Sequence, residues 1–183
     1  MMKDTVEYKL ISNHYGDRVA KRSQVPLINH INEGLVVLDA IGATEEAKRA
    51  FCLHPLFQAD ADLKENFYMA SFVFPHVLLL TMEYRSVANE FLSDKIEGLQ
   101  GVIFNYGIEG LNPGLVRLSP LKEVNDMLIA DKVQNYKDFV TYHQKTHERT
   151  SELDDYFNIW LNTLGVSDKQ YGELIKLIDE SKQ

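Results

Sequence analysis

The chain has 183 residues, of which 45% are hydrophobic and 25% charged, proportions typical of a folded globular protein and unlike those of a disordered one. Its formal charge of −8 disfavours bulk binding to nucleic acid, because neutralising a phosphate backbone requires a basic face. The single cysteine, Cys52, has no partner for an intramolecular disulfide and so gives no sign of an oxidising compartment.

The N-terminal segment is too polar for a signal peptide, and the longest unbroken apolar run, Val77 to Leu80, is too short to cross a bilayer. We therefore expect a cytoplasmic protein with no membrane partner. A chain of this length is expected to form one domain, residues 1–183, that needs neither a disulfide nor a metal in order to fold.

Apolar residues recur at helical spacing from the start of the chain. The first helix is predicted over residues 3–22 and runs into a basic segment. The cations of this segment are Arg18, Lys21 and Arg22. Two interpretations stay open, since positive charge complements the C-terminal end of a helix dipole, and a cluster of cations also suits a phosphate clamp.

Two further helices are predicted next. Pro26 is expected to open the second, as proline does at a first helical position, and Gly42 to stop it. Thr44 is the expected N-cap of the third. This helix is predicted to end at His54, because Pro55 disfavours helical backbone at the residue before it.

Residues 56–65 are interpreted as a turn and a short acidic segment. Pro75 is expected to open the longest apolar helix. Half of the ten glycines fall between residues 98 and 120, which predicts a long loop or lid. Connections of more than about 12 to 15 residues in a compact domain are usually functional.

A helix is then predicted behind Ser119 and Pro120. Its apolar stripe, spaced by three or four residues, is polar at its middle, where Asp131 and Asn135 stand. A buried carboxylate must be paired, bound to a metal or protonated, so Asp131 requires a cation nearby. The simpler alternative is a hydrogen bond to a neighbouring helix.

Two last helix starts, at Ser151 and Ser167, have the pattern of a capping box. No strand-like alternation competes with the helical pattern in the sequence. The predicted fold class is therefore all-α, a single-domain helical bundle.

His30, His54 and Asp131 fall on three different predicted helices, each near the apolar face. Two imidazoles and a carboxylate that meet inside a helical bundle are a divalent-metal site by ligand type, suited to manganese, iron, zinc or cobalt. A metal held in this way polarises a phosphoryl oxygen and generates hydroxide near neutral pH. Taken singly, each histidine also fits a hydrogen-bonded core residue.

The order of these pieces resembles the HD-domain phosphohydrolases, and most of all the alarmone hydrolases of the RelA/SpoT kind with their small stand-alone relatives. The resemblance is carried by the stretches Lys21 to His30, Ala130 to Asn135 and Tyr156 to Trp160, and by His54 at the end of a helix of alanine, phenylalanine, cysteine and leucine. It covers residues of about 15 to 65 and 120 to 165. It implies a bundle of the HD-domain type and a manganese-dependent enzyme that removes phosphate or pyrophosphate from a (p)ppGpp-like or other nucleotide.

By the same resemblance, His30, His54 and Asp131 correspond to metal ligands. The substrate contacts implied by the resemblance are Lys21, Arg22, Asn135 and Tyr156, and to these we add Tyr15, Arg18 and Lys132 as candidate substrate-binding residues. Lys21, Arg22 and Lys132 are expected to hold phosphates, and Tyr15 or Tyr156 to stack on the base.

The chain departs from that family at two places. His54 is followed by Pro55 where the family has aspartate, and proline cannot bind a metal. Four residues after His54 the family has a Glu-Asp pair that helps to activate water, and here Gln58 and an alanine stand instead. Gln58 can hold a water molecule but cannot take its proton. Asp60 or Asp62 can replace the pair only if the turn after Pro55 brings one inward, and otherwise both are solvated loop residues.

Two hypotheses follow from the sequence. The first is a metal-dependent nucleotide phosphohydrolase or pyrophosphohydrolase with an altered HD motif. The second is a catalytically impaired HD-like module that binds a nucleotide or a protein partner. Loss of the Glu-Asp pair favours the second, whereas retention of both histidines and Asp131 favours the first.

Overall fold

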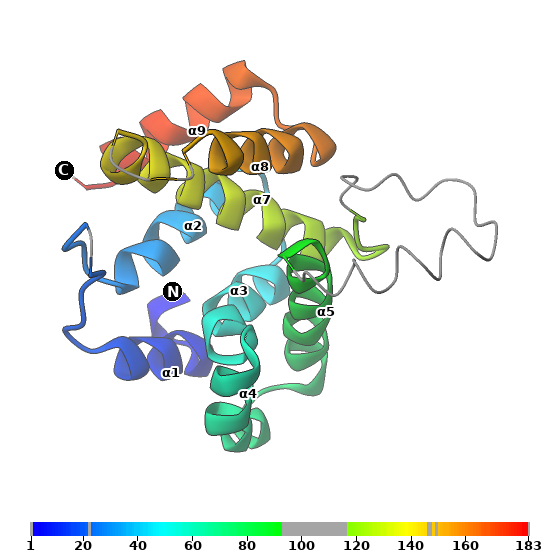
Figure 1. Ribbon diagram of the computed structural model, residues 1–183. Coiled ribbons are helices and arrows are strands. Elements are labelled where there is room, and N and C mark those ends of the chain that lie inside the picture. The colour runs from blue at the N-terminus through cyan, green and yellow to red at the C-terminus, as the bar shows by residue number, and fades with distance from the viewer. Residues whose placement is uncertain (1, 22, 93–116, 146–147, 149, 183) are drawn as a thin grey trace.

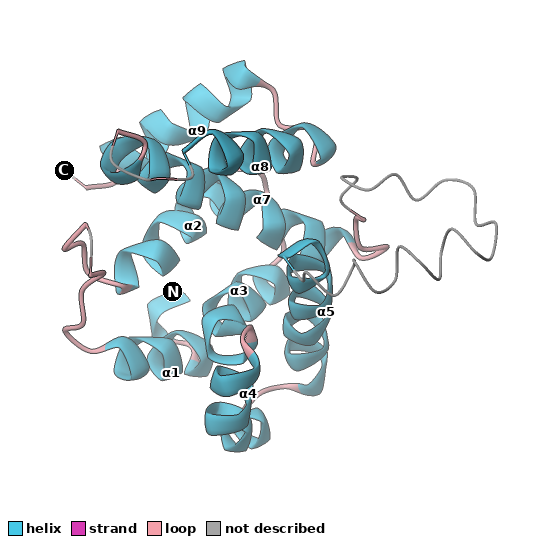
Figure 2. Ribbon diagram, in the orientation of Figure 1, coloured by secondary structure: helices cyan, strands magenta, loops and turns pink. Residues whose placement is uncertain are grey.

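The fold is all-α, as predicted. The computed structural model describes residues 2–21, 23–92, 117–145, 148 and 150–182, and the regular elements in these ranges are helices (Figures 1 and 2). In the same ranges, β-type pairing is limited to one isolated bridge, between Val19 and Pro26. The elements in chain order are η1 (Met2–Asp4), α1 (Val6–Tyr15), α2 (Ile28–Ala40), α3 (Glu45–Phe57), α4 (Asp60–Asn66), η2 (Phe67–Phe72), α5 (Pro75–Leu92), α7 (Lys122–Asp138), the π-helical turn η3 (Phe139–His143), α8 (Thr150–Thr163) and α9 (Asp168–Glu180).

The first helix is shorter than predicted. It ends at Tyr15, because Gly16 adopts a φ of 51°, a conformation that favours glycine and terminates helices. The chain then forms a loop that folds back on itself through the Val19 bridge, and α2 begins at Ile28, two residues after the proline expected to open it. The expectation of a helix through residue 22 is therefore wrong, and Arg18 and Lys21 lie on a loop.

The third helix begins as predicted and ends later. The Thr44 hydroxyl accepts a hydrogen bond of 3.2 Å from the backbone amide of Ala47, which confirms the cap. The helix then continues through Pro55 to Phe57, so its predicted end at His54 is wrong. An interior proline costs about 3 kcal/mol, but fully burying a large apolar side chain contributes roughly 1.5–3 kcal/mol. Leu56 and Phe57, both wholly buried in the last turn, offset the cost.

The segment after α3 is more helical than predicted. Asp60 and Asp62 stand in the first turn of α4, where carboxylates are favoured by the helix dipole. The prediction that Pro75 opens a long apolar helix is confirmed by α5. Of the predicted loop, residues 98–116 lie outside the described residues, and residues 117–120 lead without helix into α7.

The caps of the last helices match the sequence in part. Ser167 caps α9, since its hydroxyl accepts the backbone amide of Gln170 at 3.3 Å. Ser151 lies inside α8, which begins one residue earlier, so its predicted role as a cap is wrong. The Ser119 hydroxyl accepts a hydrogen bond of 3.1 Å from the backbone amide of Leu121, just before α7 begins.

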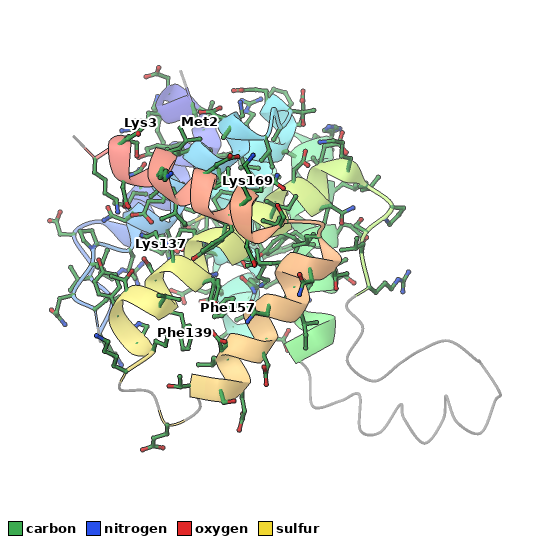
Figure 3. All side chains as sticks on the ribbon, turned by 90° about the horizontal axis from the view of Figure 1, so that it is seen from above. Met2, Lys3, Lys137, Phe139, Phe157 and Lys169 are labelled. Carbon is green, nitrogen blue, oxygen red and sulfur yellow. The ribbon has the colours of Figure 1, made fainter. Side chains whose placement is uncertain are left out.

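The helices pack around α3 and α7. Helix α3 packs against α1 and α5, and α7 packs against α2, α5, α8 and α9 (Figure 1). Seen from above, Phe139 at the end of α7 and Phe157 of α8 lie close together, with ring centroids 5.7 Å apart (Figure 3). Because α7 also contacts both α2 and α3, side chains from these three helices can meet in the interior.

Candidate metal centre

Side chains from α2, α3 and α7 converge at one point of the bundle. His30 Nε2 lies 3.0 Å from His54 Nε2, and Asp131 Oδ1 lies 3.5 Å from the first nitrogen and 3.7 Å from the second. One ligand atom of each residue falls within 4.8 Å of the others, a grouping that could hold a metal ion. The predicted meeting of these three residues is therefore confirmed.

The three residues differ in exposure. His54 and Asp131 are 2% and 4% exposed, whereas the side chain of His30 retains 20% of its accessible surface. The centre is therefore buried on the side of His54 and Asp131 and partly exposed on the side of His30. An ion bound here would contact protein on the first side and solvent or a substrate on the second.

The hydrogen bonds of Gln134 fix the proton of His30. The amide nitrogen of Gln134 donates to Glu33 Oε2 at 3.2 Å and to Asp138 Oδ2 at 2.8 Å. Carboxylates only accept, so the amide oxygen must face His30 Nδ1, 2.6 Å away. Nδ1 therefore carries the hydrogen, and the Nε2 of His30 faces the centre.

A backbone carbonyl determines which ring nitrogen of His54 carries the hydrogen. Its Nδ1 lies 2.6 Å from the carbonyl oxygen of Phe51, which can only accept. Burial, followed by the neighbouring His30, lowers the pKa of His54 to about 3. His54 is therefore neutral near pH 7, with its hydrogen on Nδ1 and the lone pair of Nε2 directed at the centre.

Asp131 is held in its charged form. Burial alone would raise the pKa of this carboxyl, but the Lys132 ammonium, His30 and His54 hold it below its usual range. Its Oδ2 accepts a hydrogen bond from Lys132 Nζ at 2.8 Å, and its Oδ1 accepts one from Asn135 Nδ2 at 2.8 Å. The charge of Asp131 is thus stabilised by two donors, the Lys132 ammonium and the Asn135 amide.

Tyr84 adds a polar atom beside the centre. Its ring contacts His54, with centroids 4.9 Å apart. Burial and the nearby Asp131 charge raise the pKa of the Tyr84 hydroxyl well above its usual value. This hydroxyl is fully buried, and Asp131 is the charged group that acts on it.

Two pockets open beside the centre, each of about 350 Å³. The first is lined by Tyr15, Ala20, Ser23, Val25, Pro26, Leu27, His30, His54, Pro55, Gln58, Asp131, Gln134, Asn135 and Asp138. The second is lined by Gln58, Asp131, Lys132, Asn135, Glu152, Leu153, Tyr156 and Phe157. The pockets share Gln58, Asp131 and Asn135, so the candidate metal centre stands where they meet.

Most residues predicted to contact substrate line these pockets. Tyr15 lies in the first pocket, Lys132 and Tyr156 in the second, and Asn135 in both. The predicted catalytic Gln58 also lines both. The Lys132 ammonium is engaged, since it bonds to Asp131 and to the Tyr156 hydroxyl at 3.1 Å.

Other predicted residues lie outside the linings. Arg18 and Lys21 are exposed on the loop after α1, and the Arg18 guanidinium donates to the carbonyls of His14 and Tyr15. Arg22 lies outside the described residues. The predicted catalytic alternatives, Asp60 and Asp62, stand on α4 outside both linings, where Asp60 pairs with Arg85.

Two supporting residues escaped the sequence analysis. Gln134 follows Asp131 by three residues, which places both on one face of α7, so the helical period could have identified it. The second is Phe51, whose backbone carbonyl accepts the hydrogen bond from His54, so its side chain gives no indication of this role. The sequence clue to it is the proline four residues later.

Comparison of the chain with models of protein families, with curated proteins and with solved structures finds no match. The resemblance to the HD-type enzymes therefore stays a prediction from the sequence. Among the described residues, no helix is both long enough and apolar enough to cross a membrane.

Proposed function

We propose that the protein is a divalent-metal-dependent phosphohydrolase or pyrophosphohydrolase that acts on a nucleotide in the manner of the HD-type enzymes. The observation that carries the proposal is the convergence of His30 Nε2, His54 Nε2 and Asp131 Oδ1, with both Nδ1 atoms already committed to acceptors. Three acceptor atoms in such proximity repel one another unless a cation lies between them.

The donor set suits a transition metal. Imidazole nitrogens with one carboxylate favour manganese, iron, zinc or cobalt, and three protein ligands leave coordination positions for water and substrate. Manganese is the metal that the resemblance favours. A divalent ion held here would polarise a phosphoryl oxygen and lower the pKa of a coordinated water.

The pocket walls offer neutral hydrogen-bonding groups around the centre. Gln58 and Asn135 line both pockets, and Tyr15 lines the first. Amides can donate to and accept from the edge of a base, and an aromatic ring can stack on its face. In this proposal Asn135 and Tyr15 orient the nucleotide, and Gln58 holds the water.

The loop after α1 contributes the proposed phosphate contacts. Ala20, Ser23 and Val25 line the first pocket, so the loop forms one of its walls. Lys21 follows Ala20 directly and is exposed. We assign Lys21 and its sequence neighbour Arg22 to the phosphates of the substrate, because an exposed cation such as Lys21 can approach an anion without the cost of burial.

A second function is favoured by one observation. The carboxylate that lines the first pocket beside Asp131 is Asp138, and its oxygens are taken by Gln134 and Lys137. Since Gln58 cannot accept a proton, the first pocket offers no unengaged carboxylate as a general base among its described residues, and the further carboxylate beside the centre, Glu152, lines the second pocket. A module that binds a nucleotide without hydrolysing it would have this character.

The test is incubation of the purified protein with Mn²⁺ and a panel of guanosine and adenosine polyphosphates, followed by chromatography of the products. Release of phosphate or pyrophosphate that disappears in His54→Ala and persists in Lys169→Ala supports hydrolysis. Lys169 is exposed on α9 and serves as the matched control. No release, together with a nucleotide that raises the melting temperature, would contradict hydrolysis and leave the binding module.

A further inference from the structure

The backbone of α3 is interrupted at one hydrogen bond, next to a metal ligand. In an α-helix the amide of residue 55 donates to the carbonyl of residue 51. Residue 55 is proline, which has no amide hydrogen, and its ring crowds that carbonyl. The Phe51 carbonyl therefore lacks the donor that it would have in a regular α-helix, the amide of residue 55.

His54 supplies the missing donor. Its Nδ1 lies 2.6 Å from the Phe51 carbonyl oxygen, and both residues are buried, so water cannot easily serve instead. The same ring packs between the rings of Phe51 and Tyr84, at centroid distances of 4.6 and 4.9 Å. One hydrogen bond and two ring contacts thus hold His54 with its Nε2 toward His30.

We propose that Pro55 is a positioning residue, which reserves the Phe51 carbonyl for the Nδ1 hydrogen of His54 and so keeps the Nε2 of His54 available to a divalent cation. The inference rests on the metal site of the proposed function and not on hydrolysis. Proline cannot bind the cation itself. Its effect is to remove a competing donor.

The first test is Pro55→Ala. Alanine restores the amide hydrogen, which competes for the Phe51 carbonyl and releases the hydrogen of His54. That hydrogen then moves to Nε2 of His54, where His30 Nε2 and Asp131 Oδ1 accept it. A protonated Nε2 has no lone pair with which to bind the metal. We expect Mn²⁺ to bind about 10- to 100-fold more weakly, as when an outer partner of a metal ligand is removed. Because alanine favours helix, we expect the metal-free melting temperature to stay the same or rise.

A second variant separates the amide from the pyrrolidine ring. Lactic acid at position 55 has the side chain of alanine, but an ester oxygen in place of the amide N–H, so it cannot donate. We expect this ester variant to bind Mn²⁺ with the affinity of the unmodified protein. Pro75→Ala is the matched control, since this proline opens α5 and frees no carbonyl of a preceding turn.

The tautomer of His54 gives a readout that needs no metal and no turnover. Long-range ¹H–¹⁵N correlation spectra of the metal-free protein should show the hydrogen on Nδ1 in the unmodified and ester proteins, and on Nε2 in Pro55→Ala. Equal Mn²⁺ affinity in the alanine and ester variants, or one tautomer in all three proteins, would overturn the proposal. Both results are independent of whether any nucleotide is hydrolysed.

Discussion

The Nε2 atoms of His30 and His54 lie 3.0 Å apart, although each ring already directs its Nδ1 hydrogen at an oxygen elsewhere. Two lone pairs at that distance repel, and the carboxylate of Asp131 adds a third acceptor. A proton or a metal ion between these atoms relieves the repulsion. The surrounding residues thus prepare a cation site through the hydrogen bonds they make behind the ligands.

Gln134→Leu tests that support for His30. Leucine has a similar size but no acceptor for the Nδ1 hydrogen, so the ring is free to change tautomer. We expect Mn²⁺ affinity to fall about 10- to 100-fold, measured by isothermal titration calorimetry. Gln170→Leu on α9 is the control and should bind as the unmodified protein does. Equal affinities in the two variants would show that Gln134 has no such role.

Asp131→Asn tests the buried ion pair. Asp131 and Lys132 are 4% and 3% exposed, so removal of the carboxylate charge leaves the ammonium buried without its partner. We expect the free energy of unfolding, measured with urea in the presence of chelator, to fall by about 3–5 kcal/mol.

The double variant Asp131→Asn with Lys132→Met removes both charges. Because replacing a whole buried pair is often nearly neutral, much of the lost stability should return. A single variant as stable as the unmodified protein, or a double variant no better than the single one, would contradict the pairing.

The pKa of His54 predicts a pH dependence of stability in the metal-free protein. Burial, then His30, lowers this pKa from 6.5 to about 3, so between these values the unfolded chain binds a proton that the folded protein does not. The free energy of unfolding therefore falls as pH decreases below about 6.5, by at most roughly 1.4 kcal/mol per pH unit for one proton. His54→Gln should show a shallower slope between pH 7 and pH 5. Identical slopes in chemical denaturation would refute this contribution.

Gln58→Glu tests whether the centre lacks only a general base. Gln58 lines both pockets, and its backbone carbonyl accepts a hydrogen bond from Asn89 at 2.8 Å that the substitution leaves in place. A carboxylate there can take a proton from water, so we expect kcat to rise by up to about 10²- to 10⁴-fold with Mn²⁺. Turnover no faster than that of the unmodified protein would contradict the proposal that Gln58 holds the attacking water.

The helical class and the meeting of His30, His54 and Asp131 could be predicted, because both the helical period and these residue types can be identified in the sequence. The end of α3 could not, since the local effect of Pro55 is outweighed by the burial of Leu56 and Phe57, which depends on packing. The loop position of Lys21 was not predicted, because it depends on the positive φ of a single residue, Gly16, which ends α1 before Lys21.

The outer partners of the histidines show a similar limit. Gln134 lies on the same helix face as Asp131 and was within reach of the helical period. For the Phe51 carbonyl, Pro55 shows only that the regular helical donor is missing, and it is the fold that brings His54 into its place.

Equilibrium dialysis against Mn²⁺, followed by metal analysis and a melting curve with and without chelator, tests the central claim most directly. We expect one ion per chain in the unmodified protein, almost none in His30→Ala, and a melting temperature that falls on chelation, because an ion present at 100 times its Kd stabilises the folded state by about 2.7 kcal/mol. A protein that retains no ion, or one that binds equally well without His30, would contradict the site.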